Sequence, residues 1–233
     1  MSRFRRVKQE VREILADPDW KARLPELEQW DPGKLVAPLF SLRLDRDENV
    51  RWRTVVAFGL TGRRLADAGM EKARVLMRTF MWHMNEESGN LGWGIPEAMA
   101  EVMVHQETLA REFSSILASY IYCDEACDGN YLDHPDLRRG VFWGLGRLAQ
   151  VRPELVSHAE RFLVAALDDG DACNRGLSAW VLGILGAGTA VSRLKRMVDD
   201  TAVFTVFRND RLEESTVGDM AREALQAMGN AEK

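Results

Sequence analysis

Hydrophobic positions along most of the chain recur every three or four residues, which is the spacing of one face of an α-helix. Residues 3–16 show this pattern first, and Asp17-Pro18 ends it because proline disrupts a helix interior. The apolar stripe of this segment consists of Phe4, Val7, Val11, Ile14 and Leu15. The pattern therefore predicts an amphipathic helix at the N-terminal end.

A second, shorter apolar stripe runs from Trp20 to Trp30, with Pro25 weakening its middle and Asp31-Pro32-Gly33 ending it. We expect these two helical segments, residues 1–32, to cap the structure that follows.

From Lys34 onward one pattern repeats: an amphipathic helix, a polar or acidic turn, and a second helix rich in small residues. The second helices are predicted to start 41, 46, 36 and 44 residues apart, at Val50, Leu91, Leu137, Cys173 and Val217. This is near the period of two-helix repeats. One helix pair cannot bury its apolar face alone, so we expect five stacked pairs over residues 33–233, forming a single domain with residues 1–32.

Three segments, ENVRWRTVVAFGL, DLRRGVFWGLGRLA and STVGDMAREALQAMG, resemble the second helix of HEAT-like repeats. In that family an acidic residue and an arginine flank the helix start, and small residues lead to a glycine. The resemblance covers roughly residues 33–229 and implies an all-α fold, an α-solenoid. Among HEAT-like proteins the chain is most similar to the phycobilisome-lyase-like proteins of bacteria. Repeats two and five lack the arginine, which argues against a continuous Asp–Arg ladder.

Residues 202–217 differ from the rest, because β-branched and aromatic residues lie on both sides of Asn209-Asp210. This composition predicts a β-hairpin that turns near residues 208–211. A two-stranded hairpin is marginal by itself, so we expect it to pack on the last repeat or to pair with another chain. Thr216 is expected to cap the final helix, with Asp219 in its first turn.

Composition and charge limit the classes of protein to consider. The chain is 46% hydrophobic and 29% charged, as in ordinary soluble proteins. Its formal net charge of −5 disfavours nucleic acid as a partner, since phosphate contacts require excess Lys and Arg. The basic N-terminus lacks the apolar core of a secretion signal, and no apolar run is long enough to span a membrane. We therefore expect a cytoplasmic protein with no membrane association.

The first candidate site is the segment WHMNEESGNLGWGIPEAMAE, residues 82–101, which combines glycines, carboxylates and tryptophans between two helical patterns. Its carboxylates could gather a cationic ligand between aromatic walls formed by Trp82 and Trp93. They are Glu86, Glu87, Glu97 and Glu101, the last two sharing one helix face. The alternative is a structural turn whose glutamates face water or neighbouring arginines.

The second candidate site is a groove of tryptophan and arginine along the later second helices. These residue types are enriched at binding hot spots, and second helices of such repeats usually line the concave surface. The candidates are Arg139, Trp143, Arg175 and Trp180. The alternative is that several of them are buried between repeats.

Evidence for catalysis or a metal is weak. Cys123 and Cys127, with Cys173 in the next turn region, are zinc-ligand types without a second paired motif, so we assign no metal. The adjacent His-Glu pairs of the HEAT-like diiron hydroxylases are absent, as are nucleophile-elbow and phosphate-loop motifs. We therefore assign no catalytic residue and no cofactor.

The leading hypothesis is a non-enzymatic binding or scaffold module that presents a concave surface to a protein or peptide partner. One alternative, implied by the phycobilisome-lyase-like resemblance, is an accessory protein that binds a cofactor or pigment. Another is a relative of the HEAT-like DNA-alkylation glycosylases, in which Trp93, Glu97, Trp143 and Trp180 would hold the lesion. The oligomeric state stays open, with pairing through the 202–217 hairpin as one option.

Overall fold

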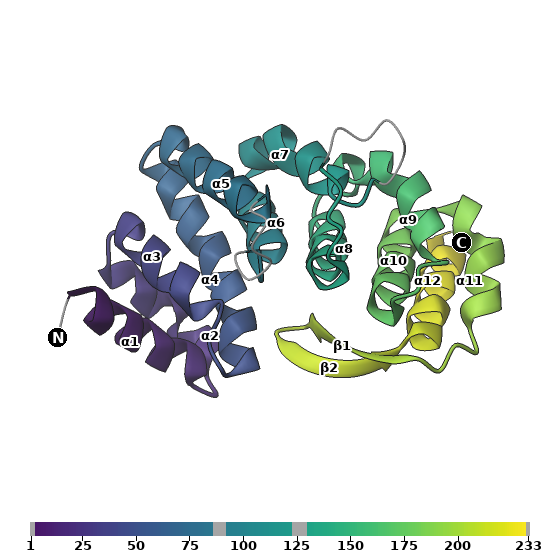
Figure 1. The fold of residues 1–233 in the computed structure, drawn as a ribbon, viewed down its shortest axis with the longest axis horizontal. Helices are drawn as coiled ribbons and strands as arrows, with labels where there is room; N and C mark the ends of the chain where they lie inside the picture. Colours follow the sequence, from purple (N-terminus) through teal and green to yellow (C-terminus); the bar gives the residue numbers. More distant parts are fainter. Residues whose placement is uncertain (1–2, 86–91, 123–129, 232–233) are drawn as a thin grey trace. The chain divides into compact units, whose positions relative to one another are not determined.

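The computed structural model describes residues 3–85, 92–122 and 130–231, and these residues are almost entirely helical (Figure 1). The chain forms two compact units, Met1–Ala110 and Arg111–Lys233, which we call unit 1 and unit 2. Each unit is described by itself. The prediction that residues 33–233 form one array, in a single domain with residues 1–32, stays a prediction.

Unit 1 consists of helices built around the long helix α4, which packs against α1, α3, α5 and α6. The helices are α1 (Arg3–Ala16), α2 (Trp20–Arg23), the 3-10 helix η1 (Leu24–Gln29), α3 (Pro32–Leu42), α4 (Glu48–Asp67), α5 (Met70–Asn85) and α6 (Ile95–His105). Helix α7 (Glu107–Ser119) carries the chain across the boundary into unit 2.

The predicted first helix is confirmed with its bounds, whereas the second segment splits into α2 and η1. Pro25 explains the change, because it stands at the start of the 3-10 helix, where its missing N–H costs nothing.

Three phenylalanines from α3, α4 and α5 form a cluster in unit 1, two of them fully buried and Phe40 half-buried. The ring centroids of Phe40, Phe58 and Phe80 lie 5.2 to 5.6 Å apart. Helices α4 and α6 approach closely at Gly59, where a Cβ would lie 2.7 Å from Cδ2 of His105. Small residues in the second helices thus allow close helix contact, as the repeat pattern predicts.

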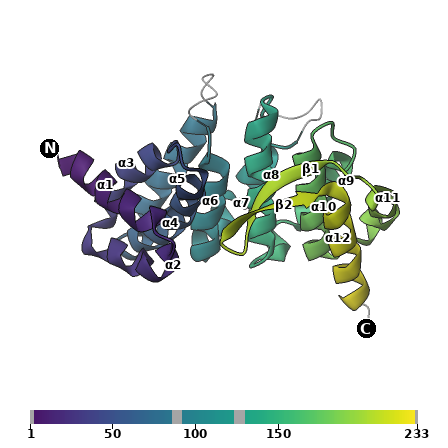
Figure 2. The same cartoon turned by 90° about the horizontal axis from the view of Figure 1, so that it is seen from below.

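Unit 2 stacks α8, α10 and α12, with shorter helices beside them and a hairpin before α12 (Figure 2). Its elements are α8 (Pro135–Ala149), η3 (Pro153–Leu155), η4 (Ser157–Ala159), α9 (Glu160–Ala166), α10 (Ala172–Leu185), η5 (Gly188–Ala190), α11 (Val191–Met197), β1 (Val203–Arg208), β2 (Arg211–Thr216) and α12 (Val217–Ala231). Gly183 brings α10 against α12, where an added Cβ would lie 2.6 Å from Cα of Ala224.

The hairpin is confirmed, with Arg208 opposite Arg211 and a two-residue turn between them. Asn209 and Asp210 both have positive φ, 52° and 65°, as the favoured hairpin turn requires. Figures 1 and 2 both show β1 and β2 running along α8, α10 and α12. The hairpin therefore packs within its own unit, as one of the two predicted alternatives stated.

Helix starts follow the capping rules. The Asp171 side chain accepts a hydrogen bond from Asn174 N (3.1 Å) at the start of α10. At α12, Thr216 Oγ1 accepts from Asp219 N (3.0 Å), and the Asp219 carboxylate accepts from Thr216 N (3.3 Å). This reciprocal pair confirms the predicted cap.

One second helix starts later than predicted. The helix of repeat two begins at Ile95, four residues after the predicted start at Leu91, which itself lies outside the described residues. Gly94 precedes it with φ of 70°, and Pro96 occupies the first turn. Across the described ranges, no helix combines the length and hydrophobicity needed to cross a membrane.

Candidate functional site

Unit 1 contains a connected group of charged and aromatic side chains, which we call the Arg43 cluster. It joins the end of α3, the last turn of α5 and the start of α6. Its members are Phe40, Arg43, Trp82, His83, Trp93 and Glu97.

Arg43 lies at the centre of this cluster and is 3% exposed. Its Nη1 donates to the main-chain oxygen of Trp93 (2.5 Å), and its guanidinium carbon lies 5.9 Å from the Phe40 ring centroid. Burial lowers the pKa of Arg43 to about 10, against the opposing effect of the Glu97 charge. Arg43 thus remains protonated at neutral pH and holds the backbone just before α6.

Glu97 lies in the first turn of α6 and supplies the charge that faces Arg43. Its Oε2 atom is buried and has no hydrogen-bond partner among the described residues. Burial raises the pKa of Glu97 to about 7, although its own backbone N–H and the positive charge of Arg43 act to lower it. The carboxyl is therefore divided between its neutral and charged forms near neutral pH.

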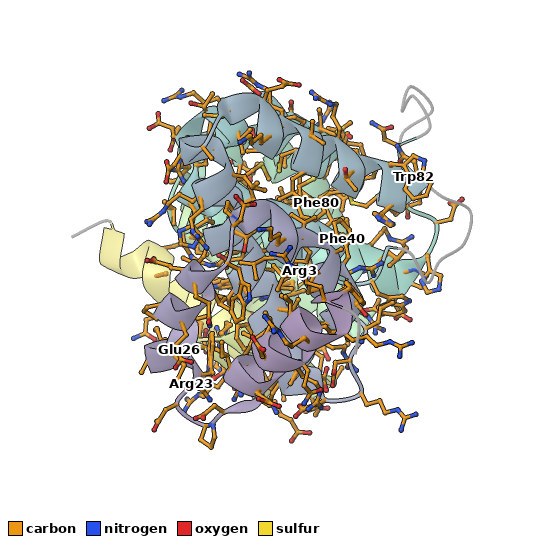
Figure 3. The ribbon with its side chains drawn as sticks, turned by 90° about the vertical axis from the view of Figure 1, so that its left-hand side faces the viewer. Arg3, Arg23, Glu26, Phe40, Phe80 and Trp82 are labelled. Atoms are coloured by element: carbon orange, nitrogen blue, oxygen red, sulfur yellow. The ribbon has the colours of Figure 1, made fainter. Side chains whose placement is uncertain are left out.

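Two tryptophans of the Arg43 cluster reach the surface. Trp82 is 56% exposed and Trp93 is 38% exposed. Trp82 contacts His83 edge to face, with centroids 5.0 Å apart, and His83 lies 4.8 Å from the Phe40 ring. Figure 3 shows Trp82 at the margin of unit 1 while Phe40 and Phe80 lie within it. The two exposed indoles thus lie next to half-buried aromatic rings and the buried Arg43.

The predicted carboxylate site in residues 82–101 requires correction. Glu101 is 2% exposed, and its Oε2 lies 3.7 Å from Nε2 of His105 on the next turn of α6. The Oε2 atom of Glu97 is buried as well, so these two carboxylates do not form an open face for a cation. Glu86 and Glu87 lie outside the described residues.

In unit 2, the two predicted arginines form ion pairs between consecutive repeats. Arg139 Nε donates to both carboxylate oxygens of Asp171 (3.1 and 3.0 Å), and Arg139 also pairs with Asp136 (2.7 Å). Arg175 Nη2 donates to Asp200 (2.9 Å) and its Nη1 to the main-chain oxygen of Asp169 (2.9 Å). Asp–Arg pairs therefore link these repeats of unit 2, so these arginines are already engaged.

The two predicted tryptophans of unit 2 do not form an open groove either. Trp143 is 3% exposed, and its Nε1 donates to the main-chain oxygen of Phe207 in β1 (2.7 Å). Trp180 covers Gly146 of α8, where a Cβ would lie 2.3 Å from the indole Cζ3. The buried indole of Trp143 also leaves no open platform there for a DNA lesion.

Metal ligation has no geometric support in the described ranges. Cys123 and Cys127 fall outside them, and Cys173 is half-buried and forms no disulfide among the described residues. Across residues 3–85, 92–122 and 130–231, no group of three or more His, Cys, Asp or Glu side chains is placed to hold a metal ion.

Sequence reasoning missed Phe40, Arg43 and His83 as parts of a site. Arg43 follows α3 beside Asp45 and Arg46, in a sequence typical of an exposed helix end. It is buried where the residues at the start of α6 reach the end of α3. Trp82 was predicted as an aromatic wall and Trp93 as a site residue, and both are exposed.

No protein-family model matches the sequence, and no curated protein matches it. Solved structures match along most of the chain. A designed armadillo repeat protein is 15% identical with a TM-score of 0.50, over 94% of this chain and 98% of that one. An engineered protein of the Northeast Structural Genomics Consortium is 12% identical with a TM-score of 0.53, over 99% and 100%.

Another designed armadillo repeat protein, solved in complex with the peptide (KR)4, is 15% identical with a TM-score of 0.50, over 94% of this chain and 98% of that one. At these identities the similarity shows the fold alone. The narrower resemblance to phycobilisome-lyase-like proteins stays a prediction. The chain is an all-α repeat protein with an armadillo-like α-solenoid fold.

Proposed function

We propose that this chain is a non-enzymatic binding module that holds a segment of a protein or peptide partner against Trp82 and Trp93 of the Arg43 cluster. The exposure of both indoles, 56% and 38%, is the observation that carries the proposal. Large aromatic rings are usually buried in a folded chain, and tryptophan is among the residues that contribute most to binding when a partner covers it.

The base of the cluster supports this role. The bond from Arg43 Nη1 to the main-chain oxygen of Trp93 holds the backbone that carries one indole. The packing of Trp82 on His83, and of His83 on Phe40, supports the other. A surface that is held in place before binding loses less conformational entropy when the partner arrives.

The fold is compatible with such a partner, since a designed protein of the same fold was solved with the bound peptide (KR)4. The net charge of unit 1 does not indicate whether the partner peptide is basic or acidic, because residues 1–110 contain as many basic as acidic side chains. A display library of linear peptides is therefore the appropriate probe, with (KR)4 as a defined cationic member.

The proposal is tested by selecting peptides on the full-length protein and measuring their affinity by calorimetry. Trp82→Ala and Trp93→Ala should each weaken a selected peptide at least tenfold, equivalent to about 1.4 kcal/mol. Phe4→Ala is the matched control, because Phe4 is 44% exposed on α1 of the same unit and lies outside the Arg43 cluster. The Phe4→Ala variant should bind the selected peptide with the same affinity as the wild type.

Two outcomes would contradict the proposal. One is a library that yields no peptide bound by the wild type. The other is a set of peptides whose affinity is unchanged in both tryptophan variants, while circular dichroism shows that the variants are folded.

A further inference from the structure

In unit 2, the chain covers one face of α8 and α10 with its own strand β1. Phe204 of β1 lies directly over Gly176 of α10, where a Cβ would come within 2.3 Å of the ring atom Cε1. Phe204 is 8% exposed, although its neighbours Val203 and Thr205 are exposed. Only glycine at position 176 permits this contact, so α10 has a seat for an aromatic side chain.

A side chain of α8 also donates a hydrogen bond to the main chain of β1. Ala202 O accepts a hydrogen bond from Val217 N (3.0 Å), so the main-chain groups of the even-numbered residues of β1 point toward β2. Main-chain groups alternate along an antiparallel strand, hence the Phe207 carbonyl points away from β2. The Phe207 carbonyl accepts the Trp143 Nε1–H of α8 at 2.7 Å. The indole of Trp143 thus forms a hydrogen bond with the edge of β1 that does not pair with β2.

The contacts that hold the hairpin at its turn end are polar and partly exposed. Arg208 Nη1 lies 2.7 Å from Glu223 Oε2 of α12, and the Glu223 side chain is 52% exposed. Ion pairs of this kind contribute little to stability. A two-stranded hairpin is itself marginal, and all of β2 is half-buried or exposed. The strand is therefore held on its seat chiefly by the buried side chains of Phe204, Val206 and Phe207, and these are the contacts that a competing segment has to replace.

We propose that the face of α8 and α10 is a second binding site, built for an extended polypeptide segment, and that β1 is its intramolecular occupant. The partner segment would carry an aromatic side chain for the Gly176 seat and, three residues later, a main-chain carbonyl for Trp143. The hairpin then acts as an autoinhibitory strap that a competing segment displaces. The inference takes from the proposed function only the idea that the partner is a polypeptide, and it concerns a different unit.

The experiment uses the full-length chain and a fluorescent synthetic peptide with the sequence of residues 202–209, AVFTVFRN. Phe204→Ser removes the anchor of β1 and leaves the seat intact. This variant should bind the peptide at least tenfold more tightly than the wild type, whose seat is occupied. Adding Trp143→Phe, which keeps an aromatic ring but removes the N–H donor, should weaken binding about fivefold, corresponding to one lost hydrogen bond.

A peptide in which serine replaces its first phenylalanine is the matched control and should not bind. Equal, weak binding of the wild-type peptide to the wild type and to a folded Phe204→Ser variant would overturn the proposal. A dimer that forms by exchange of hairpins, detected as a concentration-dependent mass, would also overturn it, since the occupant would then be a second copy.

Hydrogen exchange on the wild type gives a test that does not depend on a variant folding. The amides of β1 should exchange through an opening at least tenfold more populated than the opening that exposes the amides of α10. If both segments exchange through the same opening, the hairpin is part of the core and the proposal fails. Neither measurement uses Trp82 or Trp93, so the result is independent of the test of the proposed function.

Discussion

Glu97 of unit 1 and the half-buried Asp171 and Asp200 of unit 2 are carboxylates in opposite situations. In unit 1, Glu97 Oε2 is buried with no hydrogen-bond partner among the described residues, and burial raises the pKa of the carboxyl to about 7. In unit 2, burial acts to raise the pKa of Asp171 and Asp200, but hydrogen bonds from arginines and backbone amides outweigh it and keep both values lowered. Unit 2 therefore uses its carboxylates to join repeats, whereas unit 1 keeps one at a cost in stability.

The tryptophans predicted as site residues also differ between the two units. Trp82 and Trp93 of unit 1 are exposed, while Trp143 of unit 2 is buried and bonded to β1. A tryptophan is thus available to a partner only where the chain does not itself cover it. This difference is why the proposed function concerns unit 1, and why binding at α8 and α10 requires the hairpin to leave.

The largest effect is expected where a backbone occupies the space beside a glycine. Gly183→Ala would place a Cβ 2.6 Å from Cα of Ala224, so α10 and α12 must separate. We expect unit 2 to lose roughly 3 kcal/mol of unfolding free energy, as overpacked cores do. Denaturant unfolding monitored by hydrogen exchange in both units measures it. Gly188→Ala, with no atom within 4 Å of the added Cβ, is the control and should be near neutral.

The next effect is specific to unit 1 and depends on pH. Because the pKa of Glu97 is about 7 when folded and 4.5 in the unfolded reference, the folded chain binds more protons between these values. Its stability should therefore fall as pH rises from about 4.5 to 7, by at most about 3 kcal/mol. Glu97→Gln should remove this dependence and be more stable than the wild type at pH 8.

The control for that measurement is Glu28→Gln, an exposed carboxyl of unit 1. It should leave the pH profile of the wild type unchanged. A Glu97→Gln profile parallel to that of the wild type between pH 4.5 and 7 would show that Glu97 is not the group responsible.

A smaller loss is expected from the arginine ladder of unit 2. Arg175→Ala removes bonds to Asp200 and to the main-chain oxygen of Asp169, which are partly buried. We expect roughly 1.5 kcal/mol of destabilisation, seen as a lower melting temperature. Since the lowered pKa of Asp200 is partly due to Arg175, this contribution should be present at neutral pH and lost as pH falls below about 4. Arg211→Ala, whose side chain is 73% exposed, should have little effect.

The smallest effect concerns the cap between hairpin and helix. Thr216→Val keeps the shape of the side chain but removes the hydroxyl that accepts from Asp219 N. A lost cap costs about 1 kcal/mol. Thr205→Val, on the exposed side of β1, is the matched control. Equal melting temperatures for the two variants would mean that the cap does not stabilise α12.

Much of the fold could be predicted because local patterns carry it. The apolar spacing of residues 3–16 gives α1, and Asn209-Asp210 between β-branched and aromatic residues gives the hairpin. The candidate sites were less predictable. Trp93 was predicted and is exposed, whereas the fate of Trp143 depended on a strand more than sixty residues later in the chain.

The sequence by itself determined the helical repeat, the cap at Thr216 and the turn of the hairpin, since each depends on residues close together in the chain. Tertiary structure decided which charges are buried and which rings are open. Arg43 and Glu97 face each other only because the start of α6 reaches the end of α3, and Trp143 meets Phe207 only because β1 crosses α8. Burial and electrostatic energy depend on every neighbour in space, and the periodicity of one helix does not contain that information.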